Sequence, residues 1–77
     1  MKIRDFIETI DLRSCVDVYA EIQDTNCLLA TTFGSESLGI GINEDVLSLY
    51  DHLTISKIIY RHDNIMKRNV TIIINFK

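Results

Sequence analysis

An alternation of apolar and polar side chains in the segment CVDVYAEI, residues 15–22, is the feature that most constrains the fold. A strand with this pattern has one apolar face and an opposite face that carries Asp17, Tyr19 and Glu21. The following QDTN is typical of a turn, because Asp and Asn side chains bond to nearby backbone, and CLLATTF predicts a return strand. Placing Ile22 opposite Cys27 brings the apolar side chains of both strands to one face. The sequence therefore predicts an antiparallel hairpin in this register.

A second hairpin is predicted near the end of the chain, where TISKIIYRH and NVTIIINF flank the polar turn DNIMKRN. In the last strand the alternation assigns Val70 and Ile72 to the inner face and Thr71 and Ile73 to the outer face. The preceding strand is expected to direct these side chains outward: Lys57, Ile59 and Arg61. The last strand is the most apolar segment, so we expect it in the interior of the sheet.

A short amphipathic helix is predicted before each hairpin. Apolar side chains at positions 3, 6, 7 and 10 form one helical stripe. In NEDVLSLYDHL, Asn43 suits the N-cap, and Glu44 and Asp45 fall in the first turn, where the helix dipole favours acids. The apolar stripe expected for this second helix is Val46, Leu49, Tyr50 and Leu53.

These elements predict one α+β domain over residues 1–77. The order helix, hairpin, helix, hairpin (αββαββ) fits a two-layer structure, in which a four-stranded antiparallel sheet carries both helices on one face. The composition, 47% hydrophobic and 25% charged, is that of a globular protein. A domain of this size buries only about 60% of its unfolded surface.

The segment GSESLGIG, residues 34–41, contains all three glycines and invites comparison with phosphate-binding loops. Gly34 and Gly39 have the glycine spacing of such a loop, but Ile40 and Gly41 replace its lysine and its hydroxyl residue. Continued as a dinucleotide loop, the pattern puts Glu44 where a glycine is needed. We expect the glycines to permit a tight path from strand to helix, and no cofactor.

Catalytic and metal-binding patterns are not found either. Cys15, Cys27, His52 and His62 form no close pair with ligand spacing, so we predict no metal site and treat the cysteines as structural. His62 and Asp63 are neighbours in a strand, where they point to opposite faces. We therefore predict no enzyme activity. No segment is long and apolar enough for a membrane span or a signal peptide, so we expect a cytoplasmic location and no membrane partner.

Charge is distributed unevenly along the chain. Residues 1–51 carry three basic and ten acidic side chains, whereas residues 52–77 carry five basic and one acidic. The two parts either neutralise each other inside the fold or leave separate acidic and basic surfaces. Bases near the second hairpin could contact nucleic acid, but the net charge of −3 argues against direct nucleic-acid binding as the main role.

The outward sheet face is more apolar than a face meant only for water, which is typical of an interaction site. Two alternatives stay open: a helix or loop covers part of the face, or the assumed register is wrong by one residue. The predicted partner interface combines this face with exposed acids: Asp17, Tyr19, Glu21, Leu28, Glu36, Glu44, Asp45, Ile59 and Ile73.

The segments MKIRDFIE, VDVYAEIQDTNCLLA, ISKIIYRHDN and VTIIINFK resemble a group of short proteins from phages and mobile elements of low-GC Gram-positive bacteria. The group offers no catalytic residues to carry over. By analogy with small acidic phage proteins such as anti-CRISPR proteins, the resemblance implies an inhibitor that occupies a basic surface of a host nucleic-acid-handling defence complex, acting in the host cell cytoplasm. The alternative function is a structural or regulatory module that forms a homodimer through its sheet.

Overall fold

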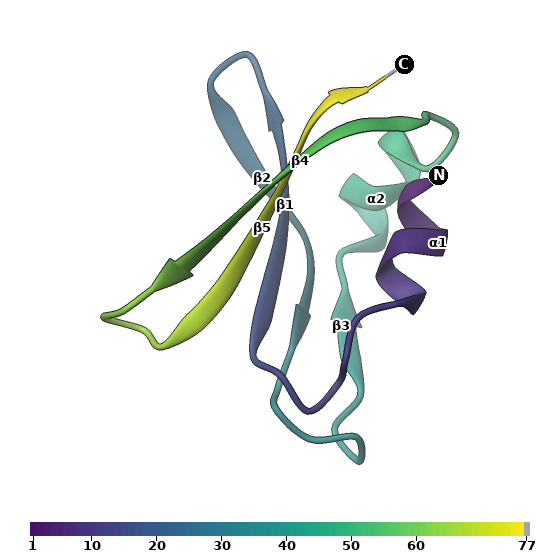
Figure 1. Cartoon of the computed structure of the whole chain (residues 1–77). Coiled ribbons are helices and arrows are strands. Elements are labelled where there is room, and N and C mark those ends of the chain that lie inside the picture. Colours follow the sequence, from purple (N-terminus) through teal and green to yellow (C-terminus); the bar gives the residue numbers. More distant parts are fainter. Residues whose placement is uncertain (77) are drawn as a thin grey trace.

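The structure, a computed structural model, describes residues 1–76, except for the side chains of residues 22 and 74–76. Two short helices and five strands follow one another along the chain (Figure 1). They are α1 (Ile3–Glu8), β1 (Val16–Ile22), β2 (Thr25–Thr32), β3 (Ile40–Ile42), α2 (Glu44–Tyr50), β4 (Ile55–Asp63) and β5 (Arg68–Phe76). The predicted α+β class and the order of helices and hairpins are confirmed, with one additional strand between them.

The sheet is mixed and five-stranded, so the predicted four-stranded antiparallel sheet is wrong. Its strand order is β3-β2-β1-β5-β4. β5 runs parallel to β1, and all other neighbours are antiparallel. The apolar β5 occupies an interior position, as expected, and the more charged β4 takes the edge. In this arrangement Ile72 and Ile73 of β5 are buried between neighbouring strands, whereas Lys57 and Arg61 of β4 are exposed.

The first hairpin has a register two residues away from the predicted one at its turn. Ile22 pairs with Thr25 and Ala20 pairs with Cys27, so the loop contains only Gln23 and Asp24. Both loop residues have positive φ, 50° and 65°, as a two-residue type I′ turn requires. The prediction placed all four residues of QDTN in this turn, because Asp and Asn are typical of turns, whereas Thr25 and Asn26 belong to β2.

A β-bulge further along β2 shifts the register again. Val18 pairs with Ala30 and Tyr19 pairs with Leu28, which leaves Leu29 without a partner in the ladder. Leu29 and Ala30 are both buried and both belong to the core cluster. The bulge therefore adds a large apolar side chain to the core. It also holds the next helix, because the Asn43 amide donates to the Leu29 carbonyl at 2.8 Å.

The core lies between the sheet and the two helices, which cover the same face (Figure 1). α1 contributes Ile3, Phe6 and Ile7, as its stripe predicted. In α2 the buried residue is Leu47, whereas Leu49 is 60% exposed. Val46 and Tyr50 of the predicted stripe pack against the core, so the stripe is confirmed in part, with Leu47 in place of Leu49 as the buried leucine.

The faces of β5 are the reverse of the prediction. Ile73 is fully buried in the helix-side core, where the parallel register pairs it with Ala20 of β1. Ile72 lies on the opposite face. Isoleucine occupies positions 72, 73 and 74 in succession, so alternation could not distinguish the two faces. The placement of Ile73 in the outer interface is thus corrected, because its side chain reaches neither solvent nor a partner.

The glycine segment forms a joint, as expected. Gly34 and Gly39 have φ of 81° and 68°, values that favour glycine, and Gly41 lies in β3. This short strand pairs with β2 and extends the sheet on the side opposite β4.

Candidate functional site: the outer face of the sheet

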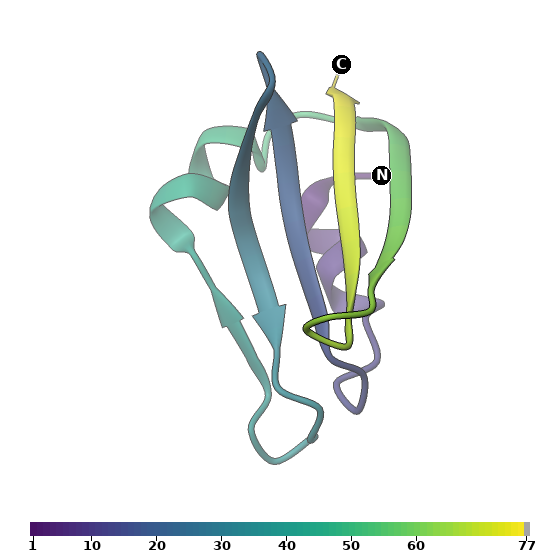
Figure 2. The same cartoon turned by 90° about the vertical axis from the view of Figure 1, so that its left-hand side faces the viewer.

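Both helices lie behind the sheet, and the other face is turned toward the viewer in Figure 2 without a helix in front of it. We call this second face the outer face. Cross-strand pairing identifies its side chains, because directly paired residues of neighbouring strands point to the same side. Among residues 1–76, neither helix packs against it, so the alternative that a helix covers the outer face does not hold.

Four apolar side chains form a continuous line across four strands of the outer face. Tyr19 of β1 is paired with Leu28 of β2 and with Ile72 of β5, and Ile72 is paired with Ile59 of β4. We refer to these four residues as the apolar row. Ile72 is only 5% exposed, yet it does not belong to the helix-side core. Its neighbours Tyr19 and Ile59 flank it, while Leu28 is 37% exposed at the end of the row.

An aromatic ring extends the apolar surface toward β3. Phe33 is 50% exposed, and a Cβ atom added to Gly41 would meet its ring at 3.4 Å. Gly41 is paired with Thr31, whose methyl group lies on the same side. The ring of Phe33 therefore rests on the outer face, where the absent side chain of Gly41 leaves room for it.

A polar network lies beside the apolar row. Arg68 makes a bidentate contact with Asp17, in which Nε and Nη2 are each 2.8 Å from a carboxylate oxygen. The same Nη2 lies 2.7 Å from the Thr31 hydroxyl and 2.9 Å from the Thr32 carbonyl. Only 22% of the Arg68 side chain and 19% of the Asp17 side chain are exposed. The network joins β1, β2 and β5.

This network changes the titration of its members. The hydrogen bonds from Arg68 are the main cause that lowers the pKa of Asp17 below its ordinary value, and the Thr31 hydroxyl lowers it further. In return, the carboxylate raises the pKa of Arg68. Asp17 is therefore an ionised group whose charge is already neutralised inside the chain.

The remaining charges divide the outer face into two sides. Glu21 lies on β1, next to the apolar row, whereas Lys57 and Arg61 lie on β4 with the same alternation as Ile59. Lys57 and Arg61 are exposed, and Glu21 is half-buried. Besides the neutralised Asp17, the described part of the outer face thus carries one acid, Glu21, on β1 and two bases on β4, and the apolar row crosses both strands.

The predicted interface residues do not form one surface. Asp17, Tyr19, Glu21, Leu28 and Ile59 share the outer face. Glu36 lies in the loop between β2 and β3. Glu44 and Asp45 begin α2, in the helix layer behind the sheet.

Glu44 is held by an ion pair. Arg4 of α1 contacts it at 2.9 Å and contacts Asp51 at 3.1 Å, and the hydrogen bonds from Arg4 lower the pKa of Glu44. Part of the uneven charge is thus neutralised inside the fold, which was one of the two alternatives that the sequence left open.

Three residues of the outer face were not predicted from the sequence: Ile72, Phe33 and Arg68. The pairing of β5 with β1 brings Ile72 and Arg68 to the outer face.

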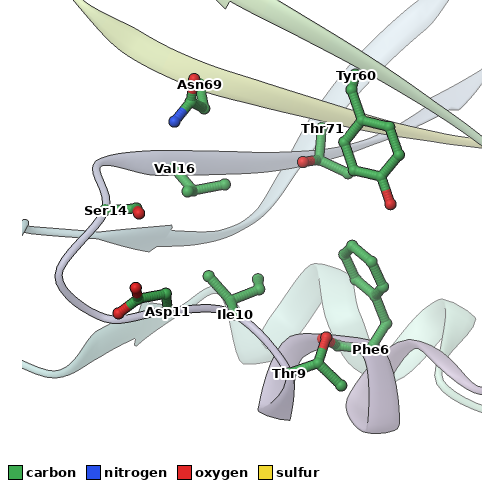
Figure 3. Close-up of a pocket in the computed structure, with 9 residues that line it drawn as sticks. All are labelled: Phe6, Thr9, Ile10, Asp11, Ser14, Val16, Tyr60, Asn69 and Thr71. Atoms are coloured by element: carbon green, nitrogen blue, oxygen red, sulfur yellow. The ribbon is translucent and has the colours of Figure 1, made fainter.

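A groove lies on the helix side, between the end of α1 and strands β1, β5 and β4 (Figure 3). Its volume is about 330 Å³. Phe6, Ile10 and Val16 give it apolar walls, and Figure 3 shows the rings of Phe6 and Tyr60 directed toward each other across it. Asp11, Ser14 and Asn69 make its other end polar.

The positions of the histidines and cysteines show whether they could act together in catalysis or in metal binding. Within the described residues, no three His, Cys, Asp or Glu side chains are placed to hold a metal ion. His62 contacts the Asn69 side chain at 3.0 Å through Nδ1, and both cysteines are free thiols.

Over residues 1–76, no helix has the length and apolar character needed to cross a membrane.

Comparison with known proteins gave no relative: no protein-family model, no curated protein and no solved structure matches the chain. The resemblance to short phage proteins therefore stays a prediction.

Proposed function

We propose that this chain is a non-enzymatic module that associates with a second copy of itself through the outer face. The observation that carries the proposal is the apolar row, which crosses a face that neither helix covers, ends in the exposed Leu28, and is flanked by an acid on β1 and bases on β4. Stable interfaces bury apolar side chains at their centre and place charged groups at their rim. The outer face has this arrangement.

A two-fold axis parallel to the strands, placed between β1 and β5, makes the apolar row complementary to itself. The axis sets β1 of one copy over β5 of the other, and β2 over β4. Tyr19 then faces Ile72 of the second copy, and Leu28 faces Ile59 of the second copy. Both sheets keep nearly aligned strands, which is the common packing of two sheets about 10 Å apart.

The same rotation matches the charges. It brings β1 of one copy diagonally next to β4 of the other, so Glu21 lies near Lys57 of the second copy. A surface of one charge sign would repel its own copy, whereas this surface attracts it. A standard interface takes about 800 Å² from each copy, and the chain exposes 4974 Å² in total. Such an interface would use about one sixth of the exposed surface.

Sedimentation velocity between 1 and 500 µM tests the proposal, and we expect the mass to rise from one chain to two. Leu28→Glu puts a charge at the end of the apolar row and should give a monomer over the whole range. Leu49→Glu is the matched control, because Leu49 is an exposed leucine on the helix side, and this variant should still dimerise. A wild-type monomer at 500 µM, or equal weakening by both variants, would exclude the proposal.

A charge exchange supplies an independent measurement. Glu21→Lys should weaken the dimer at low salt, because it puts a lysine next to Lys57 of the second copy. Lys57→Glu should weaken it in the same way. The double variant should recover most of the wild-type association, since each reversed charge again meets its opposite. Additive losses without recovery would rule out the proposed orientation of the two copies.

Inhibition of a host defence complex is a prediction of the resemblance. It requires a coherent acidic surface, and two of the proposed acids, Asp17 and Glu44, are bound to arginines of the same chain. Self-association needs no such surface, which is why the geometry supports it better. Exchanging Asp17 for lysine is also a poor probe of partner binding, because the change would leave Arg68 without its carboxylate and destabilise the fold.

A further inference from the structure

The outer strand β4 has an open edge next to the groove. β4 is the last strand of the sheet order, and its other neighbour is β5. The beginning of the edge is closed by the N-terminus, because Lys2 bridges Thr54 and the Ile55 amide donates to the Met1 carbonyl at 2.8 Å. Over residues 57–63, no other described segment of residues 1–76 pairs with this edge. An open strand edge can accept an added strand.

The inward side of this open edge leads into the groove. Tyr60 projects to the helix side, where its partner Thr71 is also a wall of the groove. Tyr60 is 68% exposed, although it is a large aromatic residue directed toward α1. The groove that Tyr60 and Phe6 line has a volume of about 330 Å³, which leaves room for one more apolar side chain beside Tyr60.

The outward side of the same edge is basic. Lys57 and Arg61 are exposed, and the residue between them in the alternation is Ile59. No acidic side chain of the described residues lies within salt-bridge distance of Lys57 or Arg61. The acid nearest in the strand is Asp63, whose carboxylate accepts the amides of Ile65 and Met66 in the turn. The bases therefore present uncompensated positive charge along the edge.

We propose that the edge of β4 binds an extended peptide segment in which acidic residues alternate with an apolar residue. The peptide pairs with residues 57–63 as a sixth strand, and its backbone supplies the hydrogen bonds. Its central side chain, preferably aromatic, enters the groove beside Tyr60. The side chains before and after it point outward, opposite Ile59 and Arg61, so that one acid meets Arg61 directly and the other reaches Lys57 diagonally across Ile59. This site adjoins the proposed dimer interface: its strand pairing and its apolar contact use the edge and the helix side, whereas Lys57 lies at the border between the two surfaces.

A capped seven-residue peptide is a suitable probe, with phenylalanine at its centre, glutamate on both sides of it and valine or threonine elsewhere. The peptide is titrated to 2 mM into ¹⁵N-labelled protein that carries Leu28→Glu, so that self-association does not contribute. We expect a Kd on the order of 100 µM. The shifted amides should lie in β4 and at the end of α1. Absence of a saturable shift would overturn the proposal without bearing on the dimer.

Altered peptides separate the three parts of the proposed contact. Methylation of the backbone amides that face β4 should abolish binding, because it removes the strand pairing. Replacement of the central phenylalanine by alanine should weaken binding at least fivefold. Lysine in place of glutamate should weaken it at least tenfold. Equal affinity of the methylated peptide would contradict edge pairing, and equal affinity of the alanine or lysine peptide would contradict the groove or the charge contact.

A matched pair of protein variants locates the contact. Arg61→Glu reverses a charge on the open edge and should weaken the acidic peptide at least tenfold, while it should improve binding of the lysine peptide. Lys67→Glu makes the same change in the turn, beyond the proposed contact, and should leave both affinities within twofold. The inversion between the two peptides is the decisive readout, because a misfolded variant would bind neither. Equal effects of Arg61→Glu and Lys67→Glu would refute the site.

Discussion

Replacement of Arg68 by leucine tests the interpretation of the outer face most directly. Its guanidinium binds Asp17 with two contacts of 2.8 Å and lies 2.7 Å from the Thr31 hydroxyl. Arg68→Leu keeps the apolar stem of the side chain but removes every one of these donors. Asp17 then retains the Thr31 hydroxyl, at 2.6 Å, among its described partners. The change leaves a largely buried carboxylate without its counter-charge.

The expected loss follows from the burial of the pair. Removal of one member of a fully buried ion pair costs about 3–5 kcal/mol, whereas an exposed pair contributes about 0–1 kcal/mol. Arg68 and Asp17 are 22% and 19% exposed, so we place the loss near the lower end of the first range, at about 3 kcal/mol. With a urea m-value of about 1 kcal/mol/M, the unfolding midpoint should fall by about 3 M. Unfolding is followed by far-UV circular dichroism at pH 7.

The pH dependence gives a second, independent check. Asp17 has a lowered pKa in the folded protein, so its ionised form stabilises the fold above the ordinary pKa of 3.8. This contribution is lost as the pH falls through the lowered pKa. The difference in unfolding free energy between wild type and Arg68→Leu should therefore be full at pH 6–7 and shrink in strongly acidic solution.

Arg13→Leu is the matched control, because Arg13 binds Asp11 on the surface, where the two side chains are 74% and 51% exposed. Its urea midpoint should stay close to that of wild type. If Arg68→Leu unfolds within 0.5 M urea of wild type, or if its deficit does not change with pH, the Asp17–Arg68 network does not stabilise the sheet as we argue.

Two further comparisons test the core and the glycine joint by thermal and urea unfolding. Leu47→Ala should cost about 3 kcal/mol, because it empties a fully buried position, while Leu49→Ala, at an exposed position of the same helix, should change the midpoint little; a loss at Leu49 as large as that at Leu47 would contradict the packing of α2. Gly34→Ala should cost about 2 kcal/mol, because it combines a φ of 81° with a Cβ only 3.0 Å from the Cys15 sulfur. Gly39→Ala, with a φ of 68° and no atom within 4 Å, should cost about 1 kcal/mol, and a larger loss at this position would contradict the packing.

Sequence reasoning succeeded where one periodicity had no competitor. The stripe of α1 contains apolar residues on one side and charged residues elsewhere, so its buried residues Ile3, Phe6 and Ile7 could be assigned. The alternation in β1 likewise identified the outward positions of Tyr19 and Glu21. In both segments a shift by one residue would bury charge, and this excludes the alternatives.

The errors arose where local pattern carries no information about tertiary pairing. Three successive isoleucines leave the faces of β5 undetermined, and the parallel contact with Ala20 decides that Ile73 points inward. The ion pair between Arg68 and Asp17 joins residues 51 positions apart, and it too depends on the pairing of β5 with β1. The bulge at Leu29 coincides with a hydrogen bond from the Asn43 amide, which comes from 14 positions further along the chain. None of these can be read from a window of neighbouring residues.

The two proposed surfaces can operate in the same assembly. The dimer axis between β1 and β5 places β4 of one copy over β2 of the other, so the two open β4 edges point in opposite directions. Each edge then remains accessible, together with the groove beside Tyr60 on the helix side. A dimer would hold two acidic peptides, one at the β4 edge of each copy. The stoichiometry would be one peptide per chain in both the monomeric and the dimeric protein.

Titration calorimetry of wild type and Leu28→Glu with the same peptide measures this ratio. A value of one peptide per two chains in the dimer would show that the copies cover one edge, and would exclude the axis that we propose.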